Sequence, residues 1–214
     1  MSLRLLVLAA GAAGLVRPAQ AQRVTIAPQL VLVDYREVSS ALRYRGEGFG
    51  GVATGRYRKL SAIAAVARVT LDPSSGSEAQ GFRATQVDAW LAYDVSPYAS
   101  VEVGLIRRSV DPELDAQSLG AVRIGARSSY ELGPGATVLF RANYLAAPKF
   151  SGGGRAAFSL DVGLGLDVRL LNRIHGVADY AFQRVDRKTD PGGQGEIEAP
   201  IQQSVARIGI GVGF

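Results

Sequence analysis

Acid–base chemistry in this sequence would depend on one histidine, His175, and on carboxylates that share their predicted strands with arginines. A general base must lie within hydrogen-bond reach of the proton that it removes. His175 precedes Gly176 in a predicted turn, where a polar residue needs no catalytic role. Asp161 and Asp179 remain as carboxylate candidates, but nearby arginines would keep both ionised, which favours ion pairing over proton transfer. We therefore expect no catalytic residue and no enzyme activity.

Metal and cofactor sites are also poorly supported by the residue types. The sequence has no cysteine, which excludes thiolate metal ligands and disulfides. The stretch Ser151–Gly154 lacks the Gly-Lys-Ser/Thr ending of a phosphate-binding loop. Asp72, Asp111 and Asp190 each precede a proline, but none of these segments has the spaced oxygen ligands of a calcium loop. We expect no metal and no cofactor.

The elements that position the charged residues are predicted from strict alternation along the chain. From Ala206 to Phe214 every second residue is apolar, and Arg207 and glycines stand between them. The segment from Phe158 to Leu170 alternates in the same way, with charges on its second face. A period of two indicates a strand whose two faces meet different environments.

Turn signals divide the chain into about ten such strands. They fall near residues 24–36, 47–58, 61–72, 82–94, 99–110, 119–132, 136–147, 156–170, 175–187 and 201–214. Short connections alternate with long ones rich in Gly, Pro, Ser and charge, which is typical of outer-membrane barrels, with both termini on the periplasmic, short-turn side. We predict an all-β, closed antiparallel up-and-down transmembrane β-barrel of about ten strands, with eight as the alternative.

The first residues have the features of a secretory signal peptide. An apolar run from Leu5 to Val16 is followed by Ala19 and Ala21 in a cleavage pattern. The run is too short to span a bilayer comfortably as an anchor. We expect residues 1–21 to be cleaved and residues 22–214 to form one outer-membrane β-barrel domain. The net charge of +5 is only mildly basic, so nucleic acid is not an expected partner.

The strand face opposite the apolar one is predicted to line the lumen. Enclosed charges need partners, because an unpaired one costs several kcal/mol, and the planar guanidinium of arginine suits this role. Barrels of about ten strands lie near the side-chain-filled end of the size range, so we expect ion pairs and Trp90 to fill the lumen. The alternative is a narrow, weakly anion-preferring pore. The predicted lumen charge network is Asp34, Arg36, Arg56, Arg68, Asp88, Glu102, Arg108, Arg123, Arg127, Glu131, Arg141, Asp161, Asp167, Arg169, Asp179 and Arg207.

Aromatic residues of the apolar phase gather near the two predicted membrane boundaries. Those at the periplasmic boundary, the periplasmic aromatic girdle, are Tyr57, Tyr93, Tyr130 and Phe214. Those nearer the outer strand ends are Tyr35, Tyr144 and Phe182. Amphipathic rings prefer the membrane interface, which explains such girdles. A soluble periplasmic β-barrel, the alternative fold, would explain the alternation but not the girdles.

Three arginines, Arg83, Arg107 and Arg184, are predicted on the lipid-facing phase near the extracellular strand ends. A cation is costly in hydrocarbon but tolerable near the interface. The phosphates of lipopolysaccharide would offer these side chains charge-assisted hydrogen bonds, which makes them candidate lipopolysaccharide contacts. In the alternative, all three side chains lie in water above the membrane.

The signal peptide, the alternation of long loops with short turns and the terminal stretch "IGIGVGF" together resemble the small bacterial outer-membrane β-barrel proteins. The resemblance implies an outer-membrane location, contact with outer-membrane lipid and lipopolysaccharide, and recognition of the C-terminal strand ending in Phe214 by the barrel-assembly machinery. It implies no particular activity. We expect a structural or surface-interaction role, with an unidentified extracellular or envelope protein as a candidate partner. An outer-membrane enzyme is a further alternative, but barrel enzymes of this kind place their histidine at the outer rim, opposite to the predicted position of His175.

Overall fold

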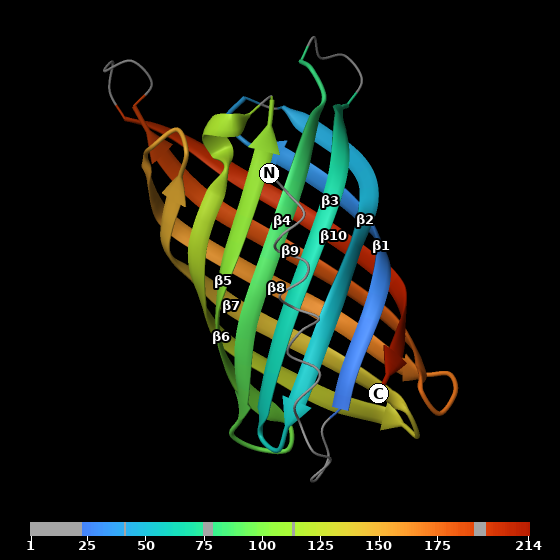
Figure 1. Ribbon diagram of the computed structural model, residues 1–214. Coiled ribbons are helices and arrows are strands. Elements are labelled where there is room, and N and C mark those ends of the chain that lie inside the picture. The colour runs from blue at the N-terminus through green and yellow to red at the C-terminus, as the bar shows by residue number, and fades with distance from the viewer. Residues whose placement is uncertain (1–22, 41, 75–78, 113, 191–195) are drawn as a thin grey trace, which may run out of the picture.

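The protein forms one closed β-barrel of ten antiparallel strands (Figure 1). The computed structural model describes residues 23–40, 42–74, 79–112, 114–190 and 196–214, so the predicted signal peptide, residues 1–21, lies outside the described residues. Each strand pairs with its neighbours in the sequence, and β1 pairs with β10 to close the barrel. The predicted fold class is therefore confirmed. Among the described residues, no helix combines the length and the apolar character needed to cross a membrane.

The observed strands agree closely with the periodicity of the sequence. They are β1 (Arg23–Glu37), β2 (Arg43–Tyr57), β3 (Leu60–Pro73), β4 (Phe82–Asp94), β5 (Ala99–Asp111), β6 (Leu119–Gly133), β7 (Ala136–Phe150), β8 (Arg155–Arg169), β9 (Ile174–Thr189) and β10 (Ile197–Gly213), with a short 3-10 helix, η2 (Asp115–Gln117), between β5 and β6. The largest differences are at β10, which begins at Ile197 and not near residue 201, and at β2, which begins at Arg43 and not near residue 47. On β2 the pattern is interrupted by two glycines, Gly46 and Gly48. Both allow close approach to β3, because a Cβ on either would lie 1.8–2.0 Å from a backbone oxygen of that strand.

The two ends of the barrel differ in their connections. Turns of two to four residues, 58–59, 95–98, 134–135 and 170–173, lie at the end where the chain closes with Phe214 (Figure 1). There the backbone N–H of Phe214 donates to the carbonyl oxygen of Val24 at 2.8 Å, so the last residue completes the β1–β10 seam. The longer connections lie at the other end. We refer to the short-turn end as periplasmic and to the long-loop end as extracellular, following the architecture of outer-membrane barrels.

The outward face of the barrel carries a continuous apolar band. Large apolar side chains on it are exposed on every strand, including Leu32, Phe49, Val66, Val87, Leu105, Ile124, Phe140, Leu164, Tyr180 and Ile208. Exposed apolar surface on this scale is unfavourable in water. It fits a hydrocarbon environment, in which closed strands satisfy every backbone hydrogen bond without an open edge.

The packed core of the protein lies inside the barrel, in its extracellular half. Inward side chains from nine of the ten strands meet there, and we call this group the apolar plug. Its centre is an aromatic trio in which the ring centroids of Tyr44 and Phe82 are 4.8 Å apart and those of Tyr35 and Phe82 are 5.7 Å apart. The plug comprises Val31, Val33, Tyr35, Tyr44, Val69, Leu71, Phe82, Ala84, Ile106, Val110, Leu119, Ala121, Leu145, Phe150, Val185, Ile201 and Val205.

The apolar plug overturns part of the predicted strand phase. On β1 the buried residues are Val31, Val33 and Tyr35, so Asp34 and Arg36 point outward and not into the lumen. On β3 the buried residues include Val69 and Leu71, so Arg68 also points outward. The sequence-based assignment to the lumen was wrong for these three charges, and the outward placement of Tyr35 was wrong for the same reason. Both faces of β1 and β3 are apolar over part of their length, so a charge on one face does not by itself show that this face points into the lumen.

Candidate functional site

The lumen below the apolar plug is a cavity of about 1410 Å³ that is lined by charged, polar and apolar side chains. It is bordered at the periplasmic end by Pro97, Tyr98 and the turn residues Gly133–Gly135. At its inner end it reaches the side chains of Gln183 and Gln203 and stops beneath the plug. The lumen is thus divided into a filled extracellular half and a hollow periplasmic half.

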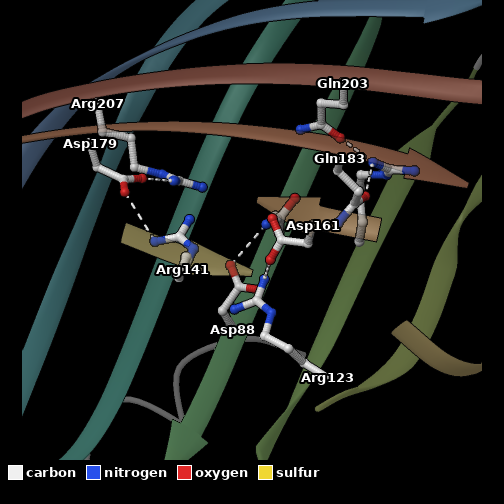
Figure 2. Close-up of polar contacts among 10 residues, drawn as sticks. Asp88, Arg123, Arg141, Asp161, Asp179, Gln183, Gln203 and Arg207 are labelled. Atoms are coloured by element: carbon white, nitrogen blue, oxygen red, sulfur yellow. Dashed lines mark hydrogen bonds and ion pairs between the residues drawn. The ribbon is translucent and has the colours of Figure 1, made fainter. Parts of the chain in front are cut away.

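The innermost ion pairs of the cavity centre on Arg123 of β6 (Figure 2). Its guanidinium lies 2.9 Å from Asp161 of β8 and 3.3 Å from Asp88 of β4, and all three side chains are more than nine-tenths buried. The same guanidinium lies over the ring of Trp90, 5.2 Å from the centroid. One guanidinium thus pairs with two carboxylates from different strands. Removal of this cation would leave two buried negative charges close to each other.

A second cluster lies beside the first, around Asp179 of β9 (Figure 2). Its two carboxylate oxygens accept hydrogen bonds from Arg141 of β7 at 3.0 Å and from Arg207 of β10 at 2.6 Å. Gly163 makes room for Arg141, because a Cβ at this position would lie 2.8 Å from the guanidinium carbon. The inward phase predicted for Gly163 agrees with the structure, but even a small side chain there would displace Arg141 from Asp179.

Nearer the periplasmic end the polar contacts are more exposed. Arg56 donates to Asp94 at 2.5 Å, and His175 Nδ1 lies 2.9 Å from Asp167 Oδ1. The exception is Glu102, which is buried although it lies near this end, with the partly exposed Arg127 3.4 Å away. His175 lies at the periplasmic end of β9 and therefore far from the extracellular rim.

The boundary between cavity and plug is formed by Arg108 of β5, which is only 2% exposed. Its guanidinium donates to the side-chain oxygens of Gln183, at 3.1 Å, and Gln203. The ring of Tyr35 lies 5.5 Å away. Among the described residues Arg108 has no carboxylate in an ion pair with it, so neutral amides and an aromatic face replace the predicted acidic partner. Gln183 and Gln203 were missed because only charged residues were sought, although both occupy inward positions of their strands.

The β5–β6 connection covers the extracellular mouth. Gln117 of η2 is buried, accepts a hydrogen bond from the Tyr35 hydroxyl, and donates to Glu37 at 3.1 Å. The backbone N–H of Gly152 donates to the carbonyl oxygen of Ala116 at 3.0 Å, which ties this connection to the β7–β8 turn. The plug is therefore closed from above as well as filled from the sides.

The predicted site residues are distributed over the lumen and the outer wall. Those on inward positions are Arg56, Asp88, Glu102, Arg108, Arg123, Arg127, Glu131, Arg141, Asp161, Asp167, Arg169, Asp179 and Arg207. Those of the periplasmic aromatic girdle, Tyr57, Tyr93, Tyr130 and Phe214, lie outward and exposed. Arg83, Arg107 and Arg184 also lie outward. No cluster of three or more metal-ligating side chains occurs in the part of the chain that the structure describes.

The charges that line the cavity are balanced. The cations are Arg23, Arg56, Arg123, Arg127, Arg141, Arg169 and Arg207, and the carboxylates are Asp88, Asp94, Glu102, Glu131, Asp161, Asp167 and Asp179. Arg23 and Asp94 were not predicted to belong to this set. The predicted lumen network has nine arginines and seven carboxylates, and this excess of arginines is absent from the cavity wall, where the two kinds number seven each.

Comparison with known proteins identifies the architecture but no close relative. No family model and no curated protein matches the sequence. Among solved structures, the outer membrane protease OmpT from Escherichia coli superposes with a TM-score of 0.50 at 10% identity, covering 90% of this chain and 96% of that chain. Neisserial surface protein A gives a TM-score of 0.46 at 12% identity, covering 90% and 99%. The fold is that of the small bacterial outer-membrane β-barrels.

A third similar structure is the attachment invasion locus protein Ail of Yersinia pestis, with a TM-score of 0.43 at 14% identity, covering 91% of this chain and all of that chain. These structures include proteins of different functions on one architecture, so the likeness establishes the fold alone. The function has to be argued from the lumen and the outer wall of this chain.

Proposed function

We propose that the protein is an outer-membrane β-barrel with a closed lumen, and that it acts through its wall and its outer surface as a structural or surface-interaction component. The observation that carries the proposal is the apolar plug, which occupies the extracellular half of the lumen with closely packed side chains from nine strands. Packed protein interiors contain few voids larger than a water molecule, so such a plug resists the passage of ions.

In this proposal the ion pairs of the cavity stabilise the barrel wall and do not close the lumen. They neutralise charges on the wall of the hollow half, and they reinforce contacts between strands that are distant in sequence, such as β6 with β8 and β7 with β9. The block to conduction lies above them. The weakly anion-preferring pore is not favoured, since the cavity ends beneath the plug and its wall charges balance.

Planar-bilayer recording of the purified protein tests the proposal. We expect little steady conductance at moderate salt. The variant Tyr44→Ala/Phe82→Ala, which opens the centre of the plug, should show a small conductance, and Arg141→Ala, which widens the cavity below the plug, should not. A heat-modifiability gel checks that each variant is folded before recording.

Two outcomes would contradict the closed lumen. Stable large channels in the wild type would show that the plug opens in a membrane. Conductance in Arg141→Ala but not in the plug variant would show that the ion pairs, and not the plug, close the lumen.

A further inference from the structure

Three arginines on neighbouring strands of the outer wall have no side-chain partner among the described residues. Arg68 of β3, Arg83 of β4 and Arg107 of β5 point outward and are exposed. Within the described residues none of them makes an ion pair or a side-chain hydrogen bond. Most other outward arginines are already engaged: Arg43 and Arg45 both bind Asp34, at 2.5 and 3.2 Å, and Arg184 binds Asp186 at 2.7 Å. Arg36 of β1 is outward and exposed without such a contact among the described residues. It lies six residues toward the extracellular end from Leu30, which shares a row with Phe49 and Arg68.

The strand register brings these three arginines into one patch. Arg68 lies opposite Thr85, which lies opposite Ser109, and one step toward the extracellular side Thr70 lies opposite Arg83. Arg107 lies one step toward the periplasm, opposite Val87. Neighbouring strands are about 4.8 Å apart, so the three guanidinium groups can converge on ligands of headgroup size. We call Arg68, Arg83, Arg107 and the hydroxyl residues Thr70, Thr85 and Ser109 the arginine patch.

The arginine patch lies directly on the extracellular edge of the apolar band. Phe49 lies opposite Arg68 on β2 and is 77% exposed, and Val66 and Leu105 are the next outward residues below Arg68 and Arg107. An arginine on a barrel wall costs about 2–4 kcal/mol at the bilayer centre and about 0–1 kcal/mol near the interface. The patch therefore has cations and hydroxyls at headgroup level and apolar side chains at acyl-chain level.

The strands next to the arginine patch on its β5 side, β6 and β7, are different. The outward positions of β6 from Gly120 to Ala126 are apolar or small, and those of β7 from Ala136 to Ala146 are apolar or aromatic. Two carboxylates lie in the row of Arg83: Asp111 of β5 lies opposite Arg83, and Glu47 of β2 lies opposite Thr70. An anion is therefore favoured on the periplasmic side of this row, nearer Arg68 and Arg107. The arginines of the patch thus have no counterpart on these stretches of β6 and β7, although Lys149 is exposed near the end of β7.

We infer that the arginine patch binds the phosphorylated sugar headgroup of a glycolipid of the lipopolysaccharide type in the outer leaflet. Phosphate oxygens would accept charge-assisted hydrogen bonds from Arg68 and Arg107. Thr70, Thr85 and Ser109 would exchange hydrogen bonds with sugar hydroxyls, and the acyl chains would lie on Phe49, Val66 and Leu105. The inference rests on the proposed outer-membrane location. Of the three arginines predicted from the sequence as lipopolysaccharide contacts, Arg184 is not part of the patch, because its guanidinium is paired with Asp186. Arg68 takes its place in the inferred site.

The test compares lipid retention by folded protein. Wild type, Arg68→Gln/Arg107→Gln and the control Arg155→Gln are folded into phosphatidylcholine liposomes and confirmed by heat modifiability. They are then extracted with mild detergent in the presence of lipopolysaccharide, dephosphorylated lipopolysaccharide or phosphatidylglycerol. Arg155 lies on β8 at the far side and donates to Glu196 at 2.8 and 2.9 Å, a contact that lowers the pKa of that carboxyl. Bound lipid is measured by native mass spectrometry.

We expect the double variant to retain lipopolysaccharide about tenfold less than wild type, and Arg155→Gln to equal wild type. Dephosphorylated lipopolysaccharide and phosphatidylglycerol should each bind wild type about tenfold less, because one lacks the phosphates and the other the phosphorylated sugars. Equal retention of lipopolysaccharide by wild type and the double variant would overturn the inference, and so would equal retention of phosphatidylglycerol and lipopolysaccharide by wild type. Failure of wild type to fold into any membrane would instead contradict the proposed outer-membrane role.

Discussion

The two halves of the lumen use the same strands in different ways. On β3 the inward residues Val69 and Leu71 belong to the packed plug, whereas Ile63 lines the cavity. On β4 the change is from Phe82 in the plug to Asp88 in the cavity. The extracellular half excludes water by packing, and the periplasmic half keeps its charges in pairs around open space. The side chains that close the lumen thus lie in the extracellular half of the barrel, and the side chains that neutralise its charges lie in the periplasmic half.

The largest expected effect comes from the buried charges of the cavity. Arg123→Met should destabilise the protein by about 3–5 kcal/mol, because Asp88 and Asp161 lose their shared cation while both remain buried. Arg56→Met should cost less than about 1 kcal/mol, since Arg56 is half-exposed and its ion pair with Asp94 is near the periplasmic end. Urea unfolding in liposomes measures both. Equal losses would show that depth in the lumen does not govern the strength of these pairs.

The next effect concerns packing within one strand. Leu71→Ala should cost about 2–5 kcal/mol, because the plug cannot collapse around the lost methyl groups. Ile63→Ala, six residues toward the periplasm from Val69 on the same face of β3, should cost about half as much or less, since the side chain already borders the cavity. The same unfolding measurement applies. A larger loss at Ile63 than at Leu71 would mean that the plug is loosely packed.

The smallest expected effect comes from substitutions that enlarge a side chain instead of truncating it. Ala121→Leu should overpack the plug and cost about 1–3 kcal/mol. Ala65→Leu projects into the cavity and should change stability by less than about 0.5 kcal/mol. Midpoints of thermal unfolding of the two variants, compared with wild type, decide this pair. If both substitutions are tolerated equally, the two halves do not differ in free volume.

Local features of the sequence were sufficient to predict the barrel architecture. Alternation with a period of two, interrupted by turn residues, defined ten strands, their approximate ends and the alternation of short and long connections. The outward aromatic positions Tyr57, Tyr93 and Tyr130 followed from the same pattern, because each lies within four residues of a turn and on an apolar phase. Properties of this kind depend on neighbours within a few residues, so they can be read without knowledge of the fold.

The tertiary structure alone decided which face of an ambiguous strand points inward and which charges meet. A period of two separates two faces but does not say which is inside when both are apolar, and Arg68 was misplaced for this reason. Partners such as Arg123 with Asp161, or Arg108 with Gln203, come from strands far apart in the chain, and their distance depends on the closure of the whole barrel. The division of the lumen into plug and cavity likewise exists only in the closed barrel. There, inward residues from strands far apart in the chain lie at the same height along the barrel axis.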